Sequence, residues 1–177
     1  MHNKIYLDLA LMGLLLLASA FDLARRRIPN GLLAFGLLGA LILHLCSPDP
    51  TVLLSTYLAG FAAGLLLFLP LYLMGGMAAG DVKLMATVGA FLGPSLVFQA
   101  SLATYCVGGV MALLIVLVRR RSRAAFANIG ALLHPWLMRL GGAPLAPDAE
   151  PAPSVGSMPY ALAITLGTAL VMWLRHS

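Results

Sequence analysis

Long apolar runs, separated by short breaks rich in glycine, proline or charge, dominate the pattern along this chain. An α-helix needs about 20 apolar residues to cross a bilayer, and somewhat fewer where the membrane is thin. We predict six membrane-spanning helices, at about 5–24, 31–46, 52–74, 82–98, 101–118 and 158–174. The weakest break lies between the fourth and fifth spans, where Gly93-Pro94-Ser95 and Gln99 are the only loop signals. The pattern therefore predicts an all-α polytopic membrane protein with one transmembrane domain over 1–177.

Composition supports this class of fold. The 177 residues are 61% hydrophobic and only 10% charged, with a mean hydropathy of +0.96, whereas a soluble domain carries about 25% charged residues. The isoelectric point of 9.7 could indicate nucleic-acid binding, but the basic residues flank apolar runs, which is the pattern of membrane orientation. We expect no nucleic-acid partner. Cys46 and Cys106 form no C-x-x-C pair, so we also expect no metal site.

The basic residues predict an orientation for the six spans. Nine of the eleven Lys and Arg residues fall on one side, after the first span, before the fourth and after the fifth. Lys4 and Arg175 fall on the other side. Because positive loops stay in the cytoplasm, we expect both termini outside it, in a bacterial cytoplasmic (inner) membrane protein.

Two acids, Asp22 and Asp81, lie at the ends of apolar spans in a chain with only six acids. An ionisable group at a membrane boundary is costly and usually functional. The predicted orientation brings both to the same cytoplasmic depth, while Asp8 and Asp49 fall at the opposite face. The alternative, in which each Asp only caps a helix or pairs with a nearby arginine, does not explain the shared depth. Two neighbouring carboxyl groups can share a proton and activate water.

The residues around these acids form two motifs. Asp22 is followed after five residues by Ile28-Pro29-Asn30, and the second acid lies in Gly80-Asp81-Val82-Lys83-Leu84. Together they resemble the type IV prepilin peptidases, of the G-x-G-D class of intramembrane aspartyl proteases. The resemblance implies that Asp22 and Asp81 are the catalytic pair. It also implies supporting roles for motif residues Gly80, Lys83, Pro29 and Asn30.

The resemblance extends to Met158-Pro159-Tyr160-Ala161, which is similar to the family's start of the last helix, but the chain departs from the family in two places. Ala78 stands where the family's G-x-G-D has its first glycine. If that position has a positive φ, alanine is strained there by about 1 kcal/mol. The longer members carry an N-terminal region with paired C-x-x-C motifs associated with N-methylation. This chain resembles the short, CpaA/TadV-like members that serve Flp-type pili, so we expect peptidase activity without methyltransferase activity.

The resemblance implies an aspartic endopeptidase that removes the short basic leader from prepilin or pseudopilin substrates at the cytoplasmic face. It implies no cofactor, and as partners the substrate, the lipid bilayer and components of a pilus or secretion machinery. Asp81 lies near a helix N-terminus and Asp22 near a C-terminus, and the helix dipole favours ionised carboxylates at N-termini. This position predicts Asp81 as the base and Asp22 as the acid.

Other features leave alternatives open. Residues 119–157 form a cytoplasmic loop in which apolar residues recur every three or four positions, typical of a helix lying in the membrane interface. The Asp pair could instead serve as a proton relay in a small transporter or channel subunit. Such relays place acids near mid-membrane more often. A third reading is an inactive assembly factor of a pilus or secretion system, which only Ala78 supports.

Overall fold

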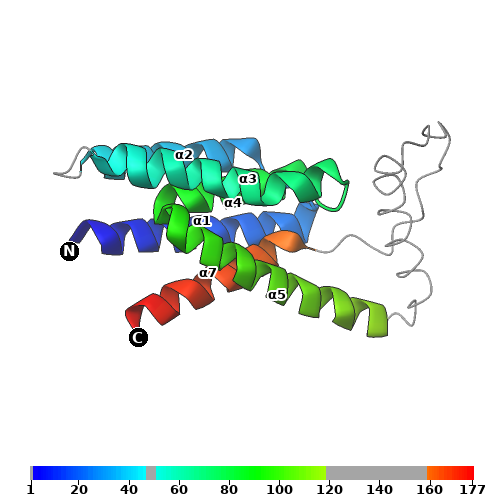
Figure 1. Ribbon diagram of the computed structural model, residues 1–177. Helices are drawn as coiled ribbons and strands as arrows, with labels where there is room; N and C mark the ends of the chain where they lie inside the picture. Colours follow the sequence, from blue (N-terminus) through cyan, green and yellow to red (C-terminus); the bar gives the residue numbers. More distant parts are fainter. Residues whose placement is uncertain (1, 47–50, 119–158) are drawn as a thin grey trace, which may run out of the picture.

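The described part of the chain is a bundle of α-helices (Figure 1). The computed structural model describes residues 2–46, 51–118 and 159–177, and no strand occurs within these ranges. The elements are α1 (His2–Arg25), α2 (Asn30–Leu45), a π-helical segment η1 (Leu53–Leu58), α3 (Ala59–Leu73), α4 (Ala79–Leu92), α5 (Pro94–Val118) and α7 (Tyr160–His176). The six α-helices confirm the predicted all-α class. The expected interfacial helix in 119–157 lies outside the described residues.

Within the described ranges, three segments are long and apolar enough to cross a membrane: Ile5–Arg25, Leu53–Leu73 and Pro94–Val118. The second joins η1 and α3 into one continuous helix. α2 is apolar but shorter, while α4 has 14 residues and α7 has 17. Large apolar side chains such as Phe35 and Val118 are exposed on the outer surface of the bundle. An apolar exterior of this kind fits contact with lipid, so this is an all-α membrane protein.

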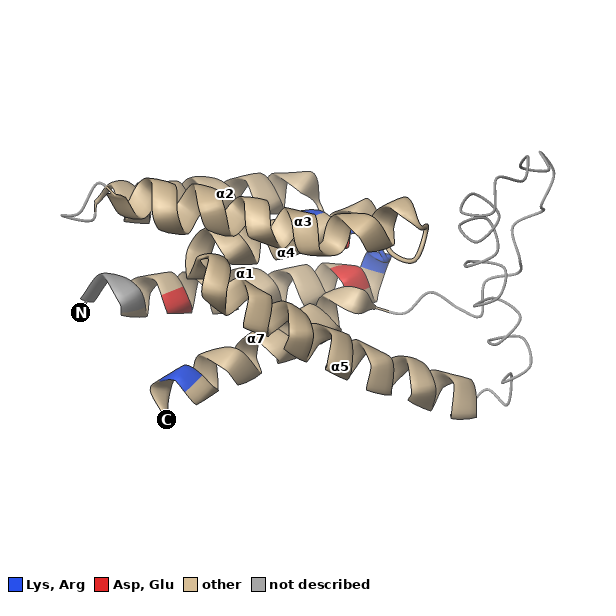
Figure 2. Cartoon of the chain, in the orientation of Figure 1, with Lys and Arg blue, Asp and Glu red and all other residues tan. Residues whose placement is uncertain are grey.

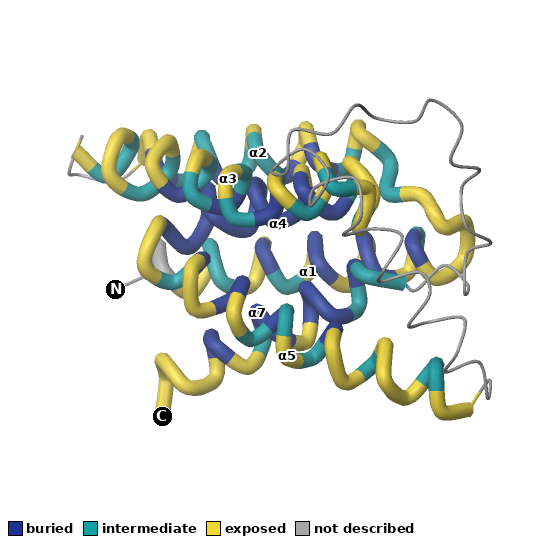
Figure 3. Tube along the Cα trace, turned by 45° about the vertical axis from the view of Figure 1, so that its right-hand side comes forward, coloured by how far each residue is buried: buried dark blue, intermediate teal, exposed yellow. Residues whose placement is uncertain are grey.

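The short helix α4 is the centre of the bundle. From Asp81 to Leu92 every residue except Lys83 is buried (Figure 3). A helix that is apolar on all sides must be surrounded by other elements, and α4 contacts α1, α2, η1, α3, α5 and α7. The other helices therefore fix the position of the residues at the start of α4.

Close contact between α3 and α4 depends on small residues. A β-carbon added at Gly60 would collide with the backbone carbonyl of Gly89, and one at Gly64 with the carbonyl of Met85. The G-x-x-x-G spacing of Gly60 and Gly64 thus lets two backbones touch, as it does in many membrane helix pairs.

The break between the fourth and fifth spans differs from the sequence prediction, which ended the fourth span at 98 and began the fifth at 101. α4 ends at Leu92 and α5 begins at Pro94. Gly93 adopts a φ of +84°, which stops α4, and proline is well suited to the first position of a helix because it needs no N–H partner there. The residues after Pro94 are apolar like those before it, so composition alone did not locate the break.

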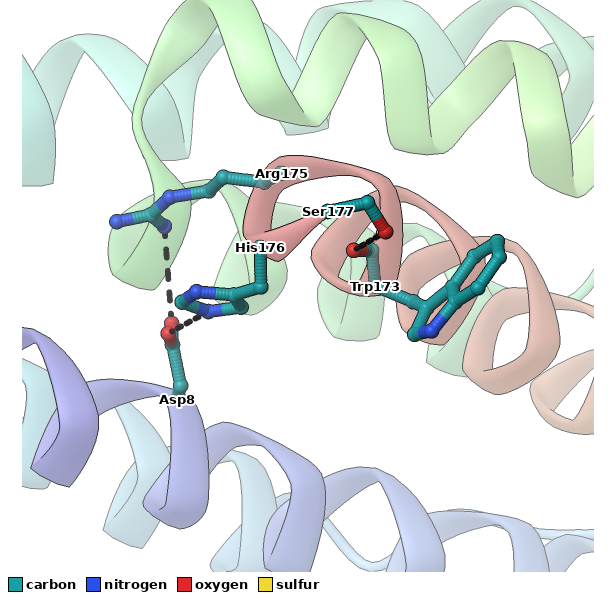
Figure 4. A network of polar contacts seen from close by, with 5 residues as sticks. All are labelled: Asp8, Trp173, Arg175, His176 and Ser177. Carbon is teal, nitrogen blue, oxygen red and sulfur yellow. Dashed lines mark hydrogen bonds and ion pairs between the residues drawn. The ribbon is translucent and has the colours of Figure 1, made fainter.

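In the part of the chain that the structure describes, the charged residues lie toward the two ends of the bundle (Figure 2). At the end that holds both chain termini, Asp8 of α1 accepts a hydrogen bond from His176 (3.0 Å) and lies 3.7 Å from the guanidinium of Arg175 (Figure 4). These contacts tie the start of α1 to the end of α7. Asp22 and Asp81 lie at the opposite end.

Candidate active site

Asp22 is buried at the last turn of α1, with 8% of its surface exposed. The helix ends at Arg25, because Arg26 adopts a φ of +54° while its N–H still donates to the carbonyl of Asp22 (2.9 Å). The arginine cluster that follows does not draw the acid to the surface, and the Arg25 guanidinium lies over the ring of Phe21, 5.7 Å from its centre. Asp22 therefore faces the interior of the bundle.

Asp81 is the third residue of α4 and is 7% exposed. It follows the loop that leaves α3. That loop begins with a Schellman turn, in which Gly76 N–H donates to Leu71 O (2.8 Å) and Gly75 N–H donates to Tyr72 O (2.9 Å). Gly75 has the positive φ, +76°, that this turn requires. The glycine pair thus reverses the chain and directs it toward the start of α4.

Ala78 is not strained. Its φ of −80° and ψ of 151° are extended values that any residue adopts. The strain expected from the sequence is therefore absent, because the loop places its positive φ at Gly75 and not at residue 78. Replacement of the family's first motif glycine by alanine leaves the backbone of this loop free to adopt its ordinary geometry.

Both acids line one cavity of about 940 Å³. The two carboxyl groups lie close enough to interact electrostatically. Around them the wall is built from the ends of α1 and α3, the glycine loop, and the starts of α2, α4 and α7, with α5 on one side. The structure thus brings together the two acids that the sequence separates by 58 residues, in a space large enough for several residues of a peptide.

Asp22 also contacts the start of α7. The backbone N–H of Ala161, in the first turn of that helix, donates to Asp22 Oδ2 over 3.2 Å. Both acids therefore lie at helix N-termini, Asp81 in α4 and Asp22 against α7. The helix-dipole argument predicted Asp81 as the base and Asp22 as the acid, but it no longer distinguishes their roles. The sequence did not reveal that the N-terminus of α7 lies against Asp22.

Three of the four supporting motif residues meet beside the cavity. Lys83 Nζ donates to Asn30 Oδ1 over 3.1 Å, and Pro29 forms the N-cap of α2, with its carbonyl accepting from Leu32 N–H (3.1 Å). The fourth, Gly80, lies under the side chain of Ile28, where an added β-carbon would come within 3.6 Å of that side chain. The two sequence motifs are thus in direct contact.

The cavity wall contains two tyrosines that the sequence analysis did not assign to the site, although it named Tyr160 in the segment that begins the last helix. Tyr105 and Tyr160 line the cavity, and Phe68 lies between them, stacked on Tyr105 with ring centres 5.1 Å apart. Tyr105 donates its hydroxyl to Leu67 O over 2.7 Å. Tyr160 packs against Gly108, where an added β-carbon would lie 3.1 Å from the tyrosine ring and the ring would have to shift by a few tenths of an ångström. No spacing signal marks these residues, because they come from different helices.

The described residues do not form an evident metal-binding site. Among the described residues, no group of three His, Cys, Asp or Glu side chains could hold a metal ion. The site therefore offers carboxyl groups, backbone amides, a lysine and tyrosines for chemistry.

Comparison with known proteins adds one match. The model of the type IV leader peptidase family matches residues 9–113, more than half of the chain. The matched region includes Asp22, Asn30, Asp81 and Lys83, and it ends before α7. Neither the curated proteins nor the solved structures gave a match.

Proposed function

The chain belongs to the type IV leader peptidase family, and from this premise we propose that Asp22 and Asp81 make it an aspartic endopeptidase. The observation that carries the proposal is that both acids, buried and from distant parts of the sequence, line one cavity and interact electrostatically. In a chain with only six acids, two meeting in one cavity is difficult to attribute to helix capping alone.

The proposed reaction needs no covalent intermediate. One carboxylate takes a proton from a water molecule whose oxygen attacks the scissile carbonyl carbon. The other carboxyl group, protonated, donates a hydrogen bond to the carbonyl oxygen and stabilises the charge that develops there. The carbon–nitrogen bond then breaks and the leaving amine receives a proton from the pair. Either acid can serve as the base in this scheme, because both line the cavity.

The proposed substrates are prepilins or pseudopilins, including those of Flp-type pili, which carry a short basic leader ahead of an apolar helix. Cleavage at that junction needs a catalytic pair at the end of a membrane bundle, where water is available. Asp22 and Asp81 occupy such an end, beside Arg25–Arg27 and Lys83. By the positive-inside rule we assign this end to the cytoplasmic face of the inner membrane. The expected absence of methyltransferase activity stays a prediction.

Two observations favour this function over the alternatives. The ordinary backbone geometry of Ala78 removes the one argument for an inactive assembly factor. The acids lie together at one end of the bundle, in the last turn of α1 and the first turn of α4, whereas transmembrane proton relays more often place their carboxylates near the middle.

The test is leader removal from a co-expressed candidate prepilin, followed by the shift in size of the pilin. Asp22→Asn and Asp81→Asn should each abolish cleavage while the protein still accumulates in the membrane. Asp8→Asn removes an acid from the same helix as Asp22 but at the other end of the bundle, and it should leave cleavage in place. Cleavage that survives either of the first two substitutions would exclude the proposed pair.

A further inference from the structure

The first turn of α7 binds the side chain of Asp22 through a backbone hydrogen bond. The first N–H groups of a helix have no partner within that helix, and Pro159, the N-cap of α7, makes no side-chain capping bond. Asp22 of α1 accepts the N–H of Ala161 instead (3.2 Å). A carboxylate from one helix thus caps another, 139 residues away in sequence. The position of Asp22 in the cavity therefore depends on where α7 begins.

The carbonyl group of the same residue, Ala161, is also hydrogen-bonded. Ala161 O lies 3.2 Å from Ser19 Oγ and 2.9 Å from Thr165 Oγ1. Ser19 and Asp22 are three residues apart on α1, and Ala161 and Thr165 are four apart on α7, so each pair shares a helix face. Ala161 of α7 is consequently bound at its N–H by Asp22 and at its carbonyl by one of the two hydroxyl groups.

The two hydroxyl groups form a directed chain. Ser19 Oγ and Thr165 Oγ1 are 2.7 Å apart, a distance at which one donates to the other. One of the two hydroxyl groups donates to the other, and the hydroxyl that accepts this bond keeps its own proton to donate. Ala161 O lies within hydrogen-bond distance of both hydroxyl groups and can accept that proton from either. Thr165 Oγ1 also lies 3.2 Å from Leu15 O of α1. The side chains of Ser19, Thr165 and Asp22 are all buried, so water does not compete for these hydrogen bonds.

We infer that Ser19 and Thr165 are positioning residues, which fix the first turn of α7 so that the Ala161 N–H holds Asp22 in its catalytic orientation. This inference rests on the proposed function of Asp22. It assigns to α7, which lies beyond the region matched by the family model, a part in the active site.

The experiment compares two valine substitutions on one helix. Thr165→Val, combined with Ser19→Ala, removes the hydroxyl chain. Thr168→Val is the matched control, because Thr168 is equally buried one turn along and its hydroxyl has no hydrogen-bond partner. We expect the double variant to lower kcat for prepilin cleavage about tenfold, which corresponds to about 1.4 kcal/mol, with KM nearly unchanged. Thr168→Val should have the kcat of the wild type. Thr165→Ser, which keeps a hydroxyl group at position 165, should retain most of the wild-type kcat.

A second measurement does not depend on cleavage. A double-mutant cycle of Asp22→Asn with Ser19→Ala/Thr165→Val, followed by thermal unfolding in detergent, should give non-additive changes in stability, because all three side chains bind the backbone of one residue, Ala161. Additive stability changes, together with a wild-type kcat in the Ser19→Ala/Thr165→Val variant, would overturn the inference. If Asp22→Asn still cleaves prepilin, the proposed function fails, while the unfolding cycle still decides whether Ser19 and Thr165 position Asp22.

Discussion

Lys83 Nζ donates a hydrogen bond to Asn30 Oδ1 over 3.1 Å, which joins the fifth residue of α4 to the first residue of α2. Each residue belongs to a different sequence motif, and each motif contains one of the two acids. Lys83 is also the only exposed residue between Asp81 and Leu92. The bond therefore connects the two halves of the candidate active site at the rim of its cavity.

This bond predicts coupled effects of two substitutions. Asn30→Ala and Lys83→Met should each slow prepilin cleavage, and the two together should cost less than the sum of their separate effects. Since the pair is exposed, we expect a coupling of about 0.5–1 kcal/mol, a factor of about 2–5 in rate. The measurement is a double-mutant cycle on cleavage rates. Fully additive effects would show that the two residues act independently.

The backbone geometry of the loop before α4 predicts different effects for substitutions at Gly75 and Ala78. Gly75→Ala should destabilise the protein by about 1–2 kcal/mol, because residue 75 has a φ of +76°. Ala78→Gly, which restores the family's motif, should not raise the cleavage rate, because Ala78 already has an unstrained φ of −80°. Thermal unfolding in detergent and initial cleavage rates measure the two effects. A large gain in rate in Ala78→Gly would mean that the alanine does impair this site.

The α3–α4 contact predicts that small residues cannot be enlarged there. Gly60→Ala should lower the free energy of unfolding by about 1–3 kcal/mol, because its β-carbon would collide with the backbone of Gly89 and the two helices would have to separate.

The control for that change is Gly39→Ala in α2, where nothing lies within 4 Å of the added β-carbon. Alanine forms helices better than glycine by about 1 kcal/mol, so this variant should be as stable as the wild type or more so. Unfolding midpoints in the same detergent compare the two. Equal effects at both positions would contradict the close contact at Gly60.

The contacts of Asp8 at the far end of the bundle predict a stabilising role without a catalytic one. Asp8→Asn should weaken the connection of α1 to Arg175 and His176 and lower stability by about 0.2–1 kcal/mol. Because exposed ion pairs are screened by salt, the difference from the wild type should shrink at high ionic strength. Unfolding midpoints at low and high salt test this. A loss that is independent of salt would indicate a role other than charge.

Much of the fold could be predicted because the apolar runs are long and their breaks are chemically distinct. Pro29-Asn30, the Gly75–Gly80 loop and Pro159 mark helix starts or turns in the sequence, and the structure places helix boundaries at each. The break at Gly93 was placed several residues too late, since apolar residues continue on both sides of it. The two acids were found because a carboxylate beside an apolar span is rare and costly.

The sequence by itself determined the helical class and singled out Asp22 and Asp81 as candidates, because both depend on local composition or on a short motif. Only the tertiary structure decided that α7 returns to α1, so that Asp22 caps the start of α7, and that Tyr105 and Tyr160 form part of the cavity wall. Those contacts join helices far apart in the chain, and helix–helix packing sets them through side-chain shape. A helical period marks which face of a helix is apolar, but it does not identify the helix that covers that face.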